Sequence, residues 1–171
     1  MHIEAEDFTC LDLSLLSLIY KWRSLYEIRK WMSDSKPFSF DDHLNFCKRL
    51  KDSASKRFFL IKLDEKPCGV QTVNIDGTKA ELGCYFINRD DGIAYKSTLF
   101  LIDYFKELGI NNFHCKILKN NIVSQKFYEK VGMRLSSEDE TYYFYNLKAF
   151  PFEDFYKLKE KALFSVITNK N

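Results

Sequence analysis

A short loop at residues 89–94, Arg-Asp-Asp-Gly-Ile-Ala, has the residue types of a phosphate-binding turn. Residues 80–87 before it alternate in polarity as strands do, and apolar residues recur at helical spacing from residue 95 to residue 108 after it. Gly92 permits a positive φ angle, so a ligand can approach the backbone closely. The first amides of a helix lack partners within the helix, and the helix dipole attracts anions to that end. The sequence therefore predicts a phosphate site between a strand and a helix, although a glycine in an ordinary tight turn would look similar.

A second motif lies at residues 121–133, which read Asn-Ile-Val-Ser-Gln-Lys-Phe-Tyr-Glu-Lys-Val-Gly-Met. Together with the Arg-x-x-Gly-x-Ala loop, this segment resembles two motifs of the GNAT N-acetyltransferases. Their pyrophosphate loop has the form Gln/Arg-x-x-Gly-x-Gly/Ala, and their second motif has the form Asn-x-x-Ala-x-x-Phe/Leu-Tyr-x-x-x-Gly-Phe. The resemblance implies an enzyme of the GNAT fold, in the α/β (α+β) class, that uses acetyl-CoA as its acetyl donor.

Asp90 and Asp91 depart from the family loop, in which neutral or basic side chains are common. Two carboxylates repel a pyrophosphate unless they point to water, so we expect backbone amides, helped by Arg89 and Lys96, to supply most of the binding. The full set of expected cofactor contacts is Cys84, Tyr85, Phe86, Arg89, Asp91, Gly92, Ile93, Ala94, Tyr95, Asn121 and Phe127.

The resemblance assigns two roles on the second predicted helix: Asn121 contacts the cofactor arm, and Tyr128 protonates the departing thiolate. The two residues are seven positions apart, close to two helical turns, and therefore share a face. A tyrosine hydroxyl with a pKa of ~10 can donate to a thiolate whose conjugate acid has a pKa of ~8.5 only if the transfer accompanies bond cleavage. The simpler alternative makes Tyr128 a packing residue and Asn121 only a helix cap.

Glu81 is the expected general base. In the strand at residues 80–87 it shares a face with Gly83 and Tyr85, opposite Leu82 and Cys84. A partly buried carboxylate at this place can take the proton of an amine, directly or through water. Backbone N–H groups near Tyr85 can stabilise the negative charge on the carbonyl oxygen. The alternative is a solvated strand residue paired with a lysine on a neighbouring strand.

Four short segments of the N-terminal half form a third pattern: Trp22-Arg23, Trp31-Met32, His43-Leu44-x-Phe46 and Phe58-Phe59-Leu60. They resemble one branch of the family, the N-acetyltransferases of bacterial pseudaminic acid biosynthesis. That branch acetylates the 4-amino group of a UDP-linked amino-dideoxy sugar, for the modification of flagellin or of surface glycans.

The resemblance to this branch implies a division of the acceptor site. Arg23 and His43 would contact the nucleotide diphosphate, and Met32, Phe46 and Tyr85 would line the sugar pocket, whose 6-deoxy methyl group favours apolar neighbours. The alternatives are a core position for Phe46 and a surface helix position for His43.

The expected order of elements, β-α-α-β-β-β-α-β-α-β-β, is that of the GNAT fold, with a mixed, mostly antiparallel sheet of about seven strands flanked by helices. We assign residues 1–148 to the acetyltransferase domain and residues 149–171 to a C-terminal extension. Residues 153–164 have the pattern of an additional amphipathic helix, followed by a polar tail. Residues 65–67, Glu-Lys-Pro, are expected to form a turn.

The composition limits the number of domains, the kinds of partner and the cellular compartment that we expect for this chain. The chain has 171 residues, of which 46% are hydrophobic, and this suits one domain with a substantial core. A net charge of +2 predicts no nucleic-acid partner. No apolar run is long enough to span a membrane. Five cysteines without a C-x-x-C pair indicate reduced thiols in a cytoplasm, and the three histidines lack metal-ligand spacing, so we expect no metal. Cys115 beside His114 cannot form a dyad, because adjacent strand residues point to opposite faces.

Three functions are open at this point: acetyl transfer to a small-molecule nucleotide sugar, acetyl transfer to a protein N-terminal amine, and a non-catalytic CoA-binding module. Ribosomal-protein acetyltransferases share a Trp-Arg-Asn opening, in which the Asn is Ser24 here, and Lys116 stands where some relatives have an acid. Asn121 and Tyr128 argue against the module, and we favour the nucleotide sugar. The sequence leaves a homodimer open and does not determine the oligomeric state.

Overall fold

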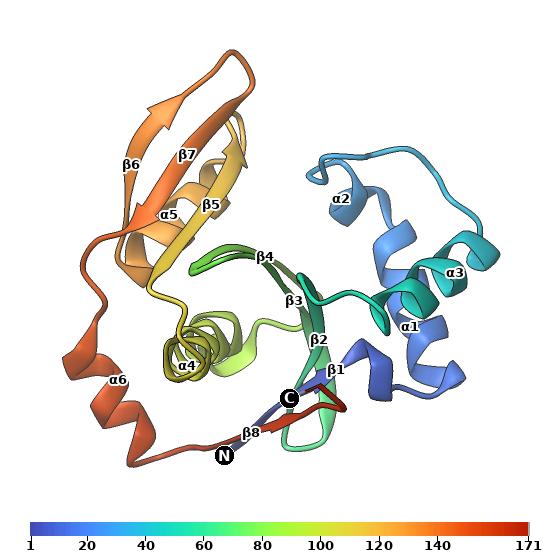
Figure 1. Ribbon diagram of the computed structural model, residues 1–171, viewed down its shortest axis with the longest axis horizontal. Helices are drawn as coiled ribbons and strands as arrows, with labels where there is room; N and C mark the ends of the chain where they lie inside the picture. The colour runs from blue at the N-terminus through green and yellow to red at the C-terminus, as the bar shows by residue number, and fades with distance from the viewer. Residues whose placement is uncertain (171) are drawn as a thin grey trace.

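The computed structural model describes residues 1–170, which form one mixed sheet with helices on both faces (Figure 1). The strands are β1 His2–Asp7, β2 Lys56–Leu63, β3 Lys66–Asp76, β4 Lys79–Phe86, β5 Asn112–Leu118, β6 Met133–Glu138, β7 Tyr142–Leu147 and β8 Leu163–Ile167. The α-helices are α1 Leu13–Ser24, α2 Tyr26–Arg29, α3 Phe40–Leu50, α4 Ile93–Glu107, α5 Ile122–Val131 and α6 Phe152–Lys159. Two short 3-10 helices, η1 Phe8–Cys10 and η2 Asp90–Gly92, precede α1 and α4.

The sheet has the strand order β6-β7-β5-β4-β3-β2-β1-β8. Neighbouring strands are antiparallel except at two places, where β4 lies parallel to β5 and β1 lies parallel to β8. The expected mixed, mostly antiparallel sheet is confirmed, with one strand more than predicted.

Local sequence signals explain where the main helices begin. Ser39 and Asp42 form a capping box at the start of α3, in which each side chain accepts a hydrogen bond from the other residue's backbone N–H. Asn121 caps α5 by accepting a hydrogen bond from the backbone N–H of Ser124 (3.2 Å). These two caps lie at the positions that the sequence indicates.

The turn expected at residues 65–67 lies one position earlier. Asp64 and Glu65 carry the positive φ angles of the turn (47° and 68°), and Pro67 already belongs to β3. The β2–β3 register shifts between Ile61 and Lys62, next to the proline. A proline fits there because the irregular pairing does not require a hydrogen bond from every residue.

The C-terminal segment differs from the single helix expected over residues 153–164. The helix α6 ends at Lys159, and Leu163 begins β8, which pairs with β1 from His2↔Leu163 to Glu6↔Ile167. A five-residue strand leaves little periodicity in a sequence, and its partner lies at the other end of the chain. This strand is the one that the sequence did not predict, and it brings the number of strands in the sheet to eight.

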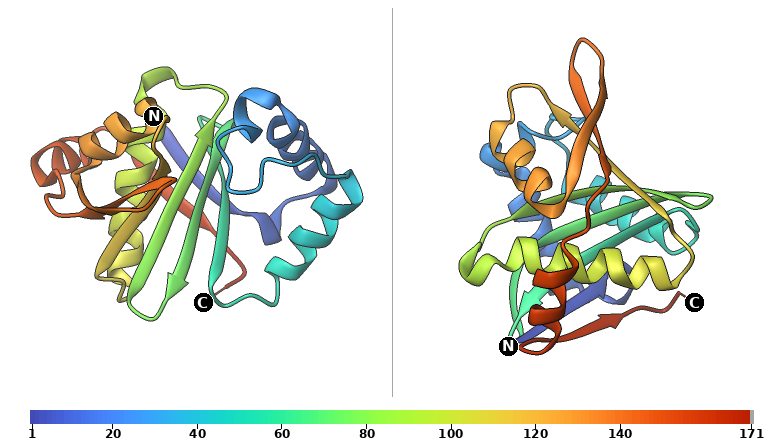
Figure 2. Two further views of the ribbon diagram at one scale, coloured as in Figure 1. Left: turned by 90° about the horizontal axis from the view of Figure 1, so that it is seen from above. Right: turned by 90° about the vertical axis from the view of Figure 1, so that its left-hand side faces the viewer.

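Helices cover both faces of the sheet (Figure 2). Each face carries its own hydrophobic cluster. The larger cluster lies between the sheet and α4 and includes Phe59, Phe105 and Phe113, each at most 1% exposed. The smaller cluster lies on the α1–α3 face and consists of Phe8, Ile19, Cys47, Leu50, Leu60 and Val70. None of the helices within residues 1–170 is long and apolar enough to cross a bilayer.

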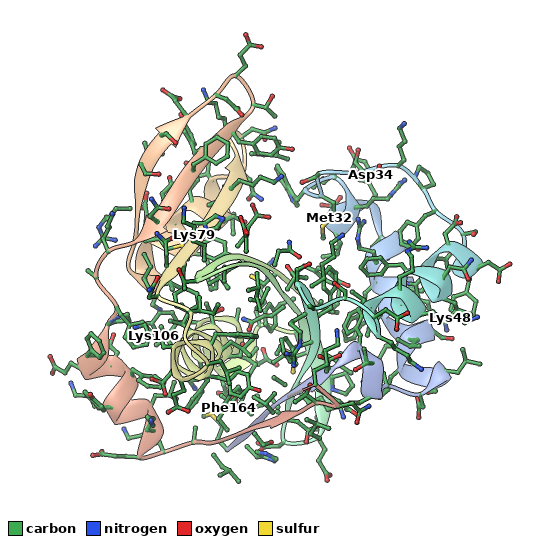
Figure 3. The ribbon with its side chains drawn as sticks, viewed as in Figure 1. Met32, Asp34, Lys48, Lys79, Lys106 and Phe164 are labelled. Carbon is green, nitrogen blue, oxygen red and sulfur yellow. The ribbon has the colours of Figure 1, made fainter. Side chains whose placement is uncertain are left out.

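Aromatic contacts join α6 and β8 to α4. The ring of Phe100 on α4 stacks on Phe164 of β8 (centroids 4.7 Å apart) and meets Phe155 of α6 edge-on (5.4 Å). Figure 3 shows Phe164 directly beside α4, and Lys106 between α4 and α6. The C-terminal segment is therefore part of the larger hydrophobic cluster.

Removing the Phe155 ring tests this packing. Phe155 is 2% exposed, whereas Phe152 on the same helix is 54% exposed. We expect Phe155→Ala to lower the free energy of unfolding by about 3–5 kcal/mol, because the change empties a buried site. Phe152→Ala, the matched control, should change it far less. Urea denaturation of the two variants measures the difference, and equal losses would show that α6 packs differently.

Candidate active site

The centre of the molecule is the place where β4 and β5 separate. The two parallel strands pair at only three positions, from Lys79↔Asn112 to Glu81↔His114, although β4 continues to Phe86 and β5 to Leu118. Figure 3 labels Lys79 at the paired end of β4, beside β5. Beyond Glu81, the edge of β4 toward β5 has no strand partner. Its backbone N–H and C=O groups are therefore available to an extended polar ligand.

The loop at residues 89–94 lies at the far end of this unpaired edge. Asp91 and Gly92 both have positive φ angles (54° and 65°), and Gly92 is the N-cap of α4 without any side-chain hydrogen bond to the helix. A Cβ atom added at Gly92 would meet nothing within 4 Å. Arg89, Asp90 and Asp91 are exposed to solvent. The first amides of α4 therefore face open space, as a site for an anion requires.

Tyr128 of α5 reaches β4 from the α4 face of the sheet. The side chain is 5% exposed, and its hydroxyl donates to Sγ of Cys84 (3.8 Å). Burial raises the pKa of Tyr128 well above its ordinary value, and the neighbouring thiols of Cys84 and Cys115 and the charge of Glu81 add to the effect. The hydroxyl therefore keeps its proton near neutral pH and can act as a hydrogen-bond or proton donor.

Cys84 lies beside that hydroxyl without being a nucleophile. Burial raises the pKa of its thiol to about 11, although the Tyr128 hydrogen bond and the charge of Arg89 act in the opposite direction. The thiol is therefore protonated near neutral pH, and a protonated thiol reacts slowly. Of these two groups, Tyr128 is therefore the predicted proton donor where the strands separate.

Glu81 lies on the opposite face of β4, in the last residue pair before the strands separate. It is half-buried and pairs in register with Asn74 on β3 as well as with His114 on β5. Its charge makes a small contribution to the raised pKa of Tyr128, whose hydroxyl contacts Cys84 three residues further along β4. A carboxylate and a phenol thus lie on opposite faces of β4 near the place where the strands separate, and their roles as proton acceptor and proton donor stay predictions.

The other predicted cofactor residues surround the divergence. Phe86 and Ile93 are buried in the larger hydrophobic cluster, and Ala94 and Phe127 pack against it. Tyr95 is half-buried, and its hydroxyl donates to Asp154 of α6 (3.4 Å). These residues shape the walls of the site, and their contacts with a cofactor stay predictions.

The five predicted acceptor residues lie on the α1–α3 side of the sheet. Phe46 and Tyr85 pack against the smaller cluster, with the Phe46 ring edge-on to Phe58 (5.1 Å). Burial raises the pKa of Tyr85, whereas the charge of Arg23 lowers it, so the guanidinium is close to the phenol. Figure 3 shows Met32 in the turn that follows α2, on the side toward β5 and β7.

His43 is more deeply buried than expected, both for a residue that contacts a diphosphate and for a residue on a helix surface. The ring is 5% exposed and packs among Tyr20, Phe38 and Phe40, with ring centroids 5.8–6.3 Å away. Its Nε2 lies 2.9 Å from the carbonyl oxygen of Leu16, which makes Nε2–H the donor. Burial lowers the pKa of His43, and the charge of Arg23 lowers it further, against the effect of the Leu16 carbonyl. The structure thus gives this histidine a packing function, and a diphosphate contact stays a prediction.

Arg29 is a residue near the acceptor side that the sequence does not single out. It lines a pocket with Tyr20, Ser24, Pro37 and Phe38, and its Nε is buried without a hydrogen-bond partner among the described residues. The signal in the sequence is weak, because Arg29 is one of several basic residues in a short helix. The break at Leu25 between α1 and α2 leaves Arg29 near enough to Arg23 for its charge to lower the pKa of Arg23.

The geometry fits a thioester of coenzyme A, an acyl donor whose activated carbonyl is attached to sulfur. The free amides of α4 suit its pyrophosphate, and the unpaired edge of β4 suits the amides of its extended arm. Tyr128 lies where β4 and β5 separate and can deliver a proton to a leaving sulfur. Within residues 1–170, no group of three or more His, Cys, Asp or Glu side chains is placed to hold a metal ion. The fold and the site therefore define an acyltransferase that uses a CoA thioester.

Comparisons with known proteins specify the family. The family model described as Acetyltransferase (GNAT) domain matches residues 16–150, so the chain belongs to the GNAT acetyltransferases. Over 148 residues it is 32% identical to the acetyltransferase PseH of Campylobacter jejuni subsp. jejuni serotype O:23/36, covering 85% of this chain and 94% of that protein. The chain is an N-acetyltransferase, and its acetyl donor is acetyl-CoA.

Two solved structures have folds similar to that of this chain. The crystal structure of Campylobacter jejuni N-acetyltransferase PseH in complex with acetyl coenzyme A has a TM-score of 0.70 at 29% identity, covering 85% of this chain and 98% of that one. The ribosomal L7/L12 alpha-N-protein acetyltransferase RimL in complex with coenzyme A has a TM-score of 0.72 at 15% identity, covering 84% of this chain and 92% of that one. The second likeness concerns the fold alone.

Gly92→Val tests the phosphate loop. The variant should raise the dissociation constant of acetyl-CoA by at least about tenfold, because a branched side chain occupies the space in front of the helix amides. Gly77→Val is a matched control, since Gly77 also has a positive φ angle (59°) and open space around it, but lies in the β3–β4 hairpin. Calorimetry with both variants separates the loop from backbone strain, and unchanged affinity in Gly92→Val would refute the assignment.

Tyr128→Phe tests the proton donor. General acid catalysis typically supplies ~10²–10⁴-fold, so kcat and kcat/KM should fall together by about that factor, with acetyl-CoA binding little changed. The phenylalanine keeps the ring of a residue that is 5% exposed, so the fold should survive. Thiol release on the identified acceptor gives the rates. A folded variant with near wild-type kcat would assign the proton to water or another hydroxyl.

Proposed function

We propose that the protein transfers the acetyl group of acetyl-CoA to the 4-amino group of a UDP-linked amino-dideoxy sugar, a small-molecule acceptor, in pseudaminic acid biosynthesis. The support from sequence is the set of acceptor-side segments and the 32% identity to PseH over most of both chains. The support from the structure is a pair of arginines on the acceptor side of the sheet.

The structural observation that supports this function most directly is that Arg23 and Arg29 have buried guanidinium nitrogens without hydrogen-bond partners among the described residues. Nη1 of Arg23 and Nε of Arg29 are both buried and make no hydrogen bond within the described residues. Burial lowers the pKa of Arg23, Tyr85 and Asp34 raise it, and the charge of Arg29 lowers it. Two neighbouring positive charges with unused N–H groups are costly unless an anion joins them.

A diphosphate is an anion of the right kind for this pair. Guanidinium groups bind phosphate oxygens through two parallel hydrogen bonds, which are among the stronger ones in proteins. The Arg23 guanidinium also stacks over the ring of Phe38 (5.3 Å to the centroid), which holds its plane in one orientation. The pocket beside it, lined by Tyr20 and Arg29 among others, has a volume of about 180 Å³ and can take a part of the nucleotide.

In this proposal the remaining residues bind the sugar or transfer protons. Met32, Phe46 and Tyr85 provide apolar surface for the sugar ring on the same side as Arg23. Glu81 takes the proton of the sugar amine, and Tyr128 gives a proton to the leaving sulfur. The burial of Tyr128 and its position opposite Glu81 support this division of proton donor and proton acceptor.

Arg23→Ala is the direct test of the nucleotide site. We expect UDP binding to weaken by about 10–100-fold, because hydrogen bonds between charged groups contribute about 1.5–3 kcal/mol. Acetyl-CoA binding should not change. Arg49→Ala removes an exposed arginine from α3 and serves as the control. Calorimetry with UDP gives both affinities.

The proposed acceptor is tested separately. Wild-type protein should release CoA thiol from acetyl-CoA in the presence of a UDP-4-amino-4,6-dideoxy sugar. If acetyl-CoA binds but UDP does not, and the sugar supports no thiol release, the acceptor assignment is wrong. Transfer to a peptide N-terminal amine under the same conditions would then favour a protein acceptor.

A further inference from the structure

A row of polar side chains crosses the α1–α3 face of the sheet, which we call the acceptor face, at the level where β4 and β5 separate. The registers place Asn74 of β3 beside Glu81 of β4, Glu81 beside His114 of β5, and His114 beside Asn146 of β7. Paired residues on neighbouring strands point to the same face, and the strands lie about 4.8 Å apart. The row therefore brings side chains from four strands into one line.

The opposite face at this level is part of the larger hydrophobic cluster. The neighbours along the same strands are buried, namely Val73, Leu82, Phe113, Cys115 and Tyr145. The polar side chains of the acceptor face therefore lie on strands whose other face is packed into a rigid apolar core. This packing holds the strands in register.

Two members of the row form the last pair of the β4–β5 ladder, Glu81 and His114. The strands open immediately beyond this pair, and three residues further along β4 the hydroxyl of Tyr128 contacts Cys84 from the other face. The charge of Glu81 is also one of the smaller contributions to the raised pKa of Tyr128. The row is therefore the polar part of the acceptor face nearest the point where the acetyl carbonyl must lie.

The row has unused hydrogen-bond acceptors. Oδ1 of Asn74 is buried and has no partner within the described residues. An unpaired buried carbonyl oxygen is destabilising, so the structure carries this cost unless a donor arrives. Between residues 1 and 170, the side chains of Glu81 and His114 make no hydrogen bond to another residue. A solvated strand face would explain Glu81 and His114, but not the buried oxygen of Asn74.

An alkylammonium group complements these acceptors. It carries three N–H donors and one positive charge, and the row offers an amide oxygen, a carboxylate and an imidazole nitrogen. The nearest charged neighbours on the same face are Lys79 on β4 and Lys116 on β5, both exposed and each two residues along its strand, with Lys56 and Arg134 at the ends of the row. The carboxylate of Glu81 is thus the one negative charge in the row.

We propose that Asn74, Glu81 and His114 together receive the amine of the acceptor, with Asn74 as a positioning residue and the Glu81–His114 pair as the proton acceptor. Oδ1 of Asn74 accepts a hydrogen bond from the amine and orients its nitrogen. The pair takes one proton from the ammonium, which frees the lone pair that forms the new C–N bond. This assignment concerns the amine itself and does not depend on which molecule carries it.

The protons balance over one turnover. A second proton leaves the nitrogen as the amide forms and the C–S bond breaks, and the Glu81–His114 pair passes the protons to solvent. Tyr128 gives its proton to the sulfur and regains one from solvent. Of the two protons that leave the nitrogen, one is thus matched by the proton on the thiol and the other is released.

Two small amines of similar size distinguish proton removal from a structural effect. Ethylamine is protonated at pH 7.5, whereas methoxyamine is neutral and needs no base before it attacks. We expect His114→Asn and Glu81→Gln to lower kcat/KM for ethylamine by about 10²-fold or more, and for methoxyamine by about tenfold or less. The acid limb of the pH profile for ethylamine should also change in both variants, because it reports the base of the free enzyme.

His2→Asn is the matched control, since this histidine lies on β1 and its Nε2 contacts Oγ of Ser165 (2.8 Å), away from the row. It should leave both amines and the pH profile unchanged. Asn74→Leu should raise KM for both amines by about tenfold with a smaller effect on kcat, because it removes an orienting contact and not the base.

Three results would overturn the inference. Equal losses for ethylamine and methoxyamine would indicate a structural role for the row. An unchanged pH profile in His114→Asn would remove the histidine from it. Absence of transfer from wild-type protein to either amine would show that the row does not receive an amine at all. UDP binding is independent of all three results, so a failure here is distinct from a failure of the sugar assignment.

Discussion

The brief contact between β4 and β5 is the constraint on which the rest of the structure depends. Three residue pairs hold the strands together, and each strand is then secured from its outer side, β4 along all of its length by β3 and β5 by β7. The opening between them is therefore a fixed feature of the sheet and not a local fraying. The backbone groups along it need partners, and a ligand with amide groups supplies them at the place where chemistry must occur.

In the proposed reaction, this opening lets the acetyl donor and the acceptor meet from opposite faces of one sheet. The α4 face supplies helix amides and the buried hydroxyl of Tyr128, whereas the α1–α3 face supplies Glu81 and the environment of Arg23. Separate hydrophobic clusters support the two faces, so each side can be shaped by its own helices. A change of acceptor can arise on the α1–α3 face without altering the machinery that holds the acetyl donor.

Local patterns predicted most elements, but not the relations between distant ones. The capping residues Ser39 and Asn121 and the strand-to-helix loop at Gly92 depend on residues within one turn, so the sequence was sufficient to locate them. The neighbourhood of Glu81 and His114 depends on register between strands that are joined by a whole helix, and no local signal specifies it. His43 shows the same limit, because a histidine on a predicted helix face does not reveal the aromatic rings that come to enclose it.

The strand β8 has a consequence for the order in which the protein folds. It pairs residue 2 with residue 163, so β1 gains its second neighbour only after residues 163–167 have left the ribosome. Contacts between such distant residues form slowly, because the intervening chain must be ordered first. Until then β1 exposes an edge on which another nascent chain could add a strand. The end of the chain thus protects its beginning, and its arrival is the step after which the sheet no longer offers that edge.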